Sequence, residues 1–183
     1  MSDQQLMFVF PGQGSQYRGM GSDLYRDFAV ARQVYDRANE VLGFDLRKLS
    51  FEDPADEIGL TRNTQPALLT HEIACLKVFQ ELTNGRVQPV MAAGHSLGEY
   101  AALVAAGVLE LKDAVPLVRL RAAAMQAAVP MGTGAMAAIL GLDDDGIRAA
   151  CAEAAQGEVA EPVNFNAAGQ TVIAGHKGAV ERA

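Results

Sequence analysis

Two short apolar runs mark the first half of the chain, and each is followed by a glycine-rich turn. Residues 6–10 (LMFVF) form a continuous apolar run, and residues 90–93 (VMAA) form the second. Continuous runs without polar alternation are typical of buried strands in a parallel sheet. The pattern predicts a short parallel sheet, with a loop over residues 11–16 after the first strand.

Apolar residues at helical spacing fill most of the sequence around these strands. The stretch 64–84 carries Leu68 and Ile73 on one face and is followed by Gly85, a residue type that commonly ends helices. Pro66 would lie in its first turn, where a missing N–H costs nothing. Further helices are predicted over residues 22–28, 30–42 and 113–129, the last with Asp113 as its N-cap and Pro116 in its first turn.

The pattern changes after the turn residues at 130–134. Residues 135–140 predict a strand and 143–155 a helix, where the acidic run at 143–145 would complement the helix dipole. Two further strands are predicted over 163–167 and 171–174, and another helix begins near Lys177. This β-α-β-β-α order matches most of a ferredoxin-like βαββαβ module. Because the sequence stops in mid-helix by this pattern, we expect it to be a piece of a longer protein.

Composition narrows the classes of function. Half of the 183 residues are hydrophobic and a fifth are charged, as in a globular protein. The formal net charge of −7 argues against a nucleic-acid partner, which needs a basic surface. Residues 100–109 are uncharged but too few to span a bilayer, and the N-terminus lacks a signal-peptide pattern. No Cys/His spacing matches a zinc site. We therefore expect a cytoplasmic protein without metal or membrane contact.

The most informative motif is residues 94–98 (GHSLG), a G-x-S-x-G sequence. It lies between the predicted strand 90–93 and a helix-forming run over 99–106, the context in which this motif forms a nucleophile elbow. The glycines permit a turn too sharp for residues with a Cβ. The hydroxyl of Ser96 would then sit at the positive end of a helix, where free N–H groups stabilise an oxyanion. An ordinary glycine-rich turn is the structural alternative.

Together these elements predict the fold class and the domain organisation. We expect an α/β fold with a hydrolase-like core over residues 1–130, in which helices flank the short parallel sheet and the elbow. Residues 131–183 would form a smaller ferredoxin-like α+β subdomain, incomplete in this sequence.

Several motifs together resemble the malonyl-CoA:acyl carrier protein transacylases. The resemblance is carried by residues 10–16 (FPGQGSQ) and 94–100 (GHSLGEY), and by Arg121 with Met125 and Gln126. It extends to residues 132–136 (GTGAM) and 162–166 (PVNFN). It implies transfer of a malonyl group from malonyl-CoA to the phosphopantetheine thiol of acyl carrier protein, in fatty-acid biosynthesis and without a cofactor.

The resemblance also implies the catalytic roles. Ser96 would attack the malonyl thioester and hold the acyl group as an ester, which divides the transfer into two acyl exchanges. The backbone N–H groups of Gln13 and Leu97 would form the oxyanion hole, which needs donors fixed before the charge develops. Without the resemblance, the sequence around Gln13 is equally compatible with a flexible turn after a strand.

Arg121 is the residue expected to select the substrate. A guanidinium can bind a carboxylate through two parallel hydrogen bonds, and a malonyl group has a free carboxylate whereas an acetyl group has none. Without the resemblance, the simpler interpretation of Arg121 is a surface arginine on an amphipathic helix. The resemblance favours the substrate-binding role instead. The remaining substrate-binding residues expected from the resemblance are His95, Gln65, Asn164 and Asn166.

The resemblance also places the general base outside this sequence. The family's catalytic histidine lies beyond the small subdomain, and neither His71 nor His176 stands in its sequence context. A serine without a base is a poor nucleophile at neutral pH. We therefore expect this chain alone to hold most of the binding site but about half of the catalytic residues.

Two alternatives remain open. An α/β-hydrolase-type esterase also uses G-x-S-x-G, but a simple esterase has no use for a carboxylate-binding arginine. A non-catalytic module that binds acyl-CoA or carrier protein is compatible with the absent histidine. Arg18, Arg62, Lys112 and Lys177 are the candidate basic contacts for an acidic carrier protein.

Overall fold

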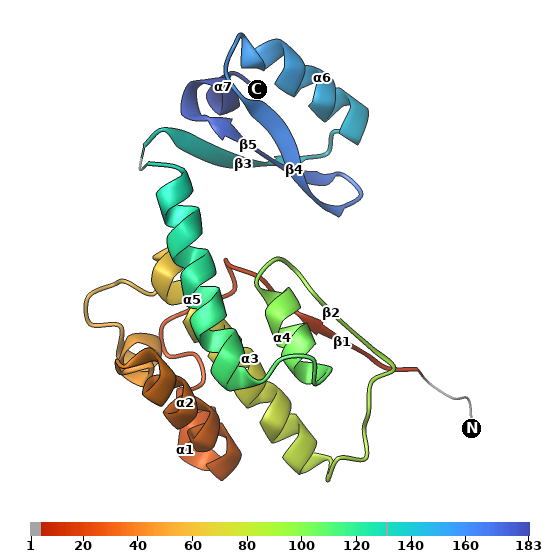
Figure 1. The fold of residues 1–183 in the computed structure, drawn as a ribbon. Helices are drawn as coiled ribbons and strands as arrows, with labels where there is room; N and C mark the ends of the chain where they lie inside the picture. Colours follow the sequence, from red (N-terminus) through yellow and green to blue (C-terminus); the bar gives the residue numbers. More distant parts are fainter. Residues whose placement is uncertain (1–4, 131) are drawn as a thin grey trace. The chain divides into compact units, whose positions relative to one another are not determined.

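The computed structural model describes residues 5–130 and 132–183, and the chain divides into two compact units, Met1–Gln126 and Ala127–Ala183 (Figure 1). The predicted assignment of residues 1–130 and 131–183 to a hydrolase-like core and a ferredoxin-like subdomain stays a prediction, and Met131 lies outside the described residues. The mixed α/β fold class is confirmed.

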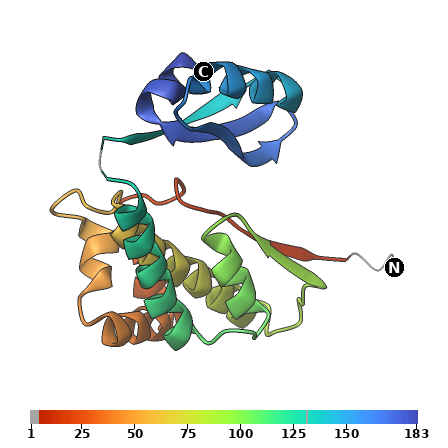
Figure 2. The same ribbon diagram turned by 45° about the horizontal axis from the view of Figure 1, so that its top comes forward.

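The first unit contains a two-stranded parallel sheet with helices packed on it. Strands β1 (Met7–Phe10) and β2 (Met91–Gly94) pair in parallel, with Phe10 opposite Gly94. Helix α4 (Gly98–Ala105) packs on both strands, and α3 (Thr61–Leu82) packs on α4 (Figures 1 and 2). The other helices of this unit are α1 (Ser22–Asp27), α2 (Ala29–Leu42), the π-helix η1 (Lys48–Glu52) and α5 (Leu111–Ala128), which continues past the unit boundary.

The core of the first unit lies between helices more than on the sheet. Fully buried side chains such as Tyr35 from α2, Leu68 from α3 and Val115 from α5 belong to one apolar cluster. On β1, Phe8 packs edge-on against Phe79 of α3, but Val9, its neighbour in the strand, is 69% exposed. The prediction that residues 6–10 form a fully buried strand is therefore wrong, because successive side chains point to opposite faces and one face of β1 is exposed here.

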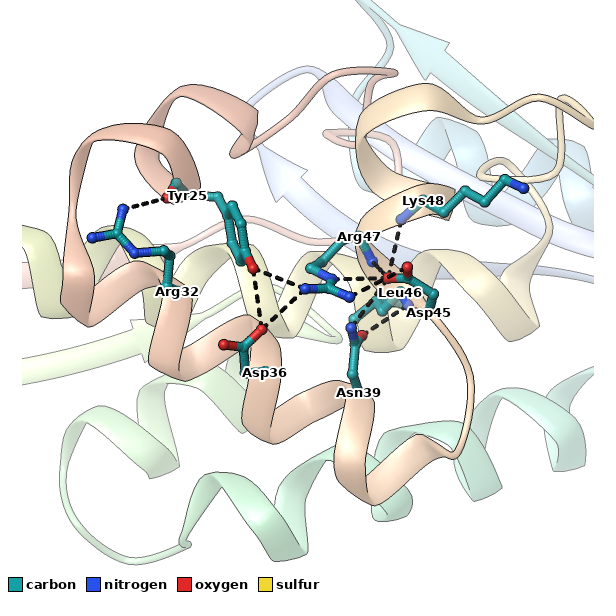
Figure 3. A network of polar contacts seen from close by, with 8 residues as sticks. All are labelled: Tyr25, Arg32, Asp36, Asn39, Asp45, Leu46, Arg47 and Lys48. Atoms are coloured by element: carbon teal, nitrogen blue, oxygen red, sulfur yellow. Dashed lines mark hydrogen bonds and ion pairs between the residues drawn. The ribbon is translucent and has the colours of Figure 1, made fainter.

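A polar network on the surface fixes the segment that leads into η1 (Figure 3). The Arg47 guanidinium donates to the Tyr25 hydroxyl at 2.8 Å and forms ion pairs with Asp36 and Asp45. The hydrogen bond from Arg47 holds the pKa of the Asp45 carboxyl below its usual value. Asn39 of α2 also donates to Asp45. These contacts join α1, α2 and the entry to η1, an element that the apolar pattern did not predict.

The second unit is a three-stranded antiparallel sheet with two helices. It runs β3 (Gly134–Leu140), α6 (Asp144–Ala155), β4 (Ala160–Ala167), β5 (Gln170–His176) and α7 (Lys177–Arg182). The strand order is β3-β5-β4, so the last strand lies between the first two. Ile147 and Ile173 are central to a separate apolar cluster. This is the β-α-β-β-α order that the sequence predicted.

The predicted starts of two long helices are wrong. Helix α3 begins at Thr61 and α5 at Leu111, so Pro66 and Pro116 lie inside the helices and not in their first turns. Asp113 is consequently a first-turn residue of α5 and not its N-cap. Among the described residues, no helix combines the length and apolar character needed to cross a membrane.

Candidate active site

Ser96 lies in the tight turn between β2 and α4, at the carboxyl end of a parallel strand. Its φ of 53° is in the left-handed region, which residues other than glycine rarely adopt. Such strain persists only where the surroundings enforce it, and it occurs preferentially at functional sites. The Ser96 side chain is exposed. The turn therefore has the backbone geometry expected of the predicted elbow.

Close backbone contacts hold this turn against the end of β1. The His95 N–H donates to the Phe10 carbonyl at 3.0 Å. A Cβ built on Gly98 would lie 2.2 Å from the same carbonyl oxygen, and one on Gly94 would lie 1.9 Å from the Gly98 carbonyl carbon. Only glycine fits at either position, which explains why the elbow needs both.

Helix α5 brings Arg121 to the serine. Arg121 Nη2 donates to Ser96 Oγ at 3.0 Å, and Nη1 donates to Gln65 Oε1 at 2.8 Å. The guanidinium carbon also lies 5.7 Å from the centre of the Tyr100 ring, within cation–π range. Within the part of the chain that the structure describes, no carboxylate pairs with Arg121. The cation beside the serine oxygen is therefore available to an anionic ligand.

Gln65 connects α3 to α5 at this point. Its side chain on α3 is completely buried, and its Nε2 donates to Met125 Sδ on α5 at 3.3 Å. Sequence reasoning assigned Gln65 to substrate binding but gave no role to Met125 or Tyr100. Met125 follows Arg121 by one turn of α5, and this helical spacing is the signal that could have found it. Tyr100 lies in the first turn of α4, directly after the elbow.

The loop after β1 lies next to the elbow. A Cβ on Gly12 would be 2.6 Å from His95 Nδ1, so the loop backbone packs directly on His95. The Gln13 side chain donates to Thr61 Oγ1 at 3.2 Å. Across residues 5–130 and 132–183, the backbone N–H groups of Gln13 and Leu97 have no acceptor. They meet the requirement for oxyanion donors, and that role stays a prediction.

Asn164 and Asn166 lie on β4, in the second unit. Their predicted contribution to substrate binding stays a prediction, as does that of the exposed His95.

A second set of ionisable groups lines a groove of about 400 Å³ between β1 and α3, and Ser96 is not part of it. Glu72 is 5% exposed there, and burial raises its pKa to about 8. Burial also lowers the pKa of His71, whose Nε2 lies 3.5 Å from Cys75 Sγ. Among the described residues, the side-chain hydrogen bond of Ser96 is with Arg121, and the prediction that His71 is not its base stays a prediction.

The fold and this geometry together define a class of protein. A serine on a strand–turn–helix elbow, with free backbone N–H groups and a cation at its oxygen, is typical of enzymes that transfer acyl groups through a serine. Residues 7–183 match the acyl transferase domain family, and the chain belongs to that family.

The most similar curated relatives include one particular kind of acyltransferase. The chain is 55% identical over 179 residues to the malonyl CoA-acyl carrier protein transacylase of Escherichia coli K12, and 48% identical over 180 residues to that of Bacillus subtilis. These alignments cover 98% of this chain but 57% and 56% of the relatives. The chain thus spans little more than half the length of the curated relatives it matches.

Solved structures similar to this chain are also malonyltransferases. The acyl carrier protein S-malonyltransferase of Vibrio cholerae matches with a TM-score of 0.91 and 55% identity, over 98% of this chain and 58% of that one. A malonyl-transacylase solved in complex with a type II PKS acyl-carrier protein matches with a TM-score of 0.93 and 52% identity, over 98% and 57% of the two chains.

Proposed function

We propose that this chain carries the acyl-binding and nucleophilic part of an acyltransferase that moves a malonyl group from coenzyme A to acyl carrier protein, in fatty-acid biosynthesis. The observation that carries the proposal is the 3.0 Å contact between Arg121 Nη2 and Ser96 Oγ. A carboxylate-bearing acyl group bound to that oxygen would place its acid within reach of the guanidinium. The identity to malonyl CoA-acyl carrier protein transacylases supports the same substrate.

The proposed reaction has two acyl exchanges. The Ser96 oxygen attacks the thioester carbonyl, the carbon–sulfur bond breaks, and coenzyme A leaves as a thiol with the serine proton. The phosphopantetheine thiol of the carrier protein then attacks the ester, and the proton returns to Ser96. The N–H groups of Gln13 and Leu97 would stabilise the oxyanion of each tetrahedral intermediate. These steps need no redox or metal chemistry, so the proposal assigns no cofactor.

The proton of Ser96 also needs an acceptor. Arg121 donates to the serine oxygen, and a guanidinium stays protonated in proteins. We propose that the general base is a histidine outside these 183 residues, and that the whole protein works in the cytoplasm. On this proposal the chain alone forms the seryl ester slowly and turns over far less than a complete relative.

Arg121 separates this proposal from the esterase alternative, and formation of a seryl ester separates it from the binding module. A simple esterase gains nothing from a cation that selects a second carboxylate on the acyl group. A purely binding module would hold malonyl-CoA without forming an ester.

The test is covalent labelling of the full chain by malonyl-CoA and acetyl-CoA, read by intact-protein and peptide mass spectrometry. We expect a malonyl ester on Ser96 and none in Ser96→Ala. Loss of one charge-assisted pair in Arg121→Ala should lower the malonyl-to-acetyl labelling ratio on the order of tenfold to a hundredfold. Arg119→Ala is the matched control, because Arg119 lies on the same helix but donates to the Leu42 carbonyl. An unchanged ratio in Arg121→Ala would contradict the malonyl assignment.

A further inference from the structure

The direction of the Arg121 guanidinium depends on a neutral amide. An arginine side chain is long and flexible, so its planar group recognises a carboxylate well only when its orientation is fixed beforehand. Gln65 Oε1 accepts from Arg121 Nη1 at 2.8 Å, and Gln65 is completely buried. Gln65 therefore holds the Nη1 group of the guanidinium, and the Nη2 group faces Ser96.

A glutamine amide can present either of its ends. If the Gln65 amide were reversed, its NH2 group would face the guanidinium, donor against donor, and the contact would be lost. The other end of the amide meets Met125 Sδ, 3.3 Å from Gln65 Nε2. A thioether sulfur accepts hydrogen bonds and donates none. The sulfur therefore favours the one amide orientation that presents an oxygen to Arg121.

We propose that Met125 is a positioning residue for substrate selection, because its sulfur orients the Gln65 amide and, through it, the Arg121 guanidinium. The inference rests on the proposed function, in which Arg121 binds the carboxylate of the acyl group. Met125 itself touches neither Ser96 nor Arg121 through any hydrogen bond of the described residues. Its effect is thus expected on recognition of the carboxylate and not on the reactivity of the serine.

The test uses the full chain with sodium malonate as the probe. Binding is followed by NMR, through the Arg121 Nε–H signal and the side-chain NH2 signals of Gln65. Met125→Leu removes the sulfur at similar volume, and Met136→Leu is the control because Met136 is 64% exposed on β3. We expect Met125→Leu to shift the Gln65 NH2 signals and to weaken malonate binding about twofold to fivefold, because a thioether is a weak acceptor and one hydrogen bond of ordinary strength is worth about fivefold.

The outcomes separate this inference from the proposed function. If malonate binds the original chain and Met125→Leu equally, with unmoved Gln65 signals, while Arg121→Ala loses binding, the role of Met125 is wrong and the malonyl assignment stands. If Arg121→Ala binds malonate as well as the original chain does, the assignment and the inference both fail. Should Met125→Leu not fold, a nuclear Overhauser contact between the Gln65 NH2 protons and the Met125 methyl group in the original chain replaces it. That contact should be present, and its absence overturns the proposal.

Discussion

Glu72 is the residue whose charge agrees least with its surroundings. Its side chain is 5% exposed on α3, and neither carboxyl oxygen has a hydrogen-bond partner among the described residues. Burial disfavours the charged form and raises the pKa to about 8, from an ordinary value of 4.5. The folded chain therefore binds this proton more tightly than the unfolded chain.

The pH dependence of stability follows from that difference. The stabilisation is fully present below the unfolded pKa and is lost as the pH rises toward the folded pKa of about 8. Glu72→Gln stays neutral, so we expect it to raise the free energy of unfolding by about 3 kcal/mol near pH 7 and to change it little near pH 4. Urea unfolding at both pH values measures this. Glu81→Gln on the exposed surface of the same helix is the control, and equal pH dependence in Glu72→Gln and the original chain would contradict the account.

The residues of the site differ in how far sequence could predict them. The elbow around Ser96 is a local arrangement of glycines between a strand and a helix, so its geometry follows from adjacent residues. The contact between Ser96 and Arg121 joins a turn residue to a helix residue 25 positions later, and no periodicity predicts it. The residues alone favoured a surface arginine at position 121, and the expectation that Arg121 selects the substrate came from the family resemblance and stays a prediction. Met125 received no role because its sulfur acts through a second side chain.

At the scale of elements, the elbow depends on a backbone contact that any side chain would destroy. A Cβ on Gly98 would lie 2.2 Å from the Phe10 carbonyl oxygen and 2.5 Å from that of Pro11. Gly98→Ala must therefore push α4 away from the end of β1. Overpacking of a tight contact typically costs about 1–3 kcal/mol, and this contact involves backbone that cannot repack.

We expect Gly98→Ala to lower stability by at least about 2 kcal/mol and to abolish labelling of Ser96 by malonyl-CoA. Thermal unfolding and mass spectrometry measure the two effects. Gly59→Ala is the matched control, because a Cβ there meets nothing within 4 Å and the residue has no positive φ. If Gly98→Ala kept both the stability and the labelling of the control, close packing of the elbow on β1 would not be what positions the serine.

Helix boundaries were predictable where a local capping residue marks them. Asp143 precedes α6, and its side chain accepts from the Gly146 N–H at 2.8 Å, so the predicted start near residue 143 is close to the observed one. Helix α3 follows Leu60, which makes no side-chain cap. Without a cap, Pro66 was the remaining sequence signal for the start of α3. The predicted start near residue 64 was too late, because Pro66 is tolerated inside the helix. The π-helix η1 has no apolar period of its own, and it depends on long-range polar contacts such as those of Arg47.

At the scale of the whole molecule, the chain has two separate apolar cores. One cluster joins α2, α3, α4 and α5, and the other joins α6, α7 and the antiparallel sheet. The predicted division near residue 130 rests on the change from helical spacing to a β-α-β-β-α pattern there, and the two compact units meet between residues 126 and 127. Burial was harder to predict, because the exposure of Val9 depends on what covers each face of β1 and not on the apolar run itself.

Separate cores predict separate responses to mutation. Ile147 is 1% exposed in the cluster of the second unit, and truncation of such a side chain to alanine costs about 2–5 kcal/mol. We expect Ile147→Ala to increase backbone hydrogen exchange throughout residues 132–183, measured by mass spectrometry, while peptides from α3 keep the exchange rates of the original chain. Leu140→Ala is the control within the same unit, since Leu140 is 70% exposed and should change little. Leu68→Ala in the first core should give the reverse pattern. Equal acceleration of both units by either core variant would mean that they unfold as one cooperative body, despite their separate clusters of buried residues.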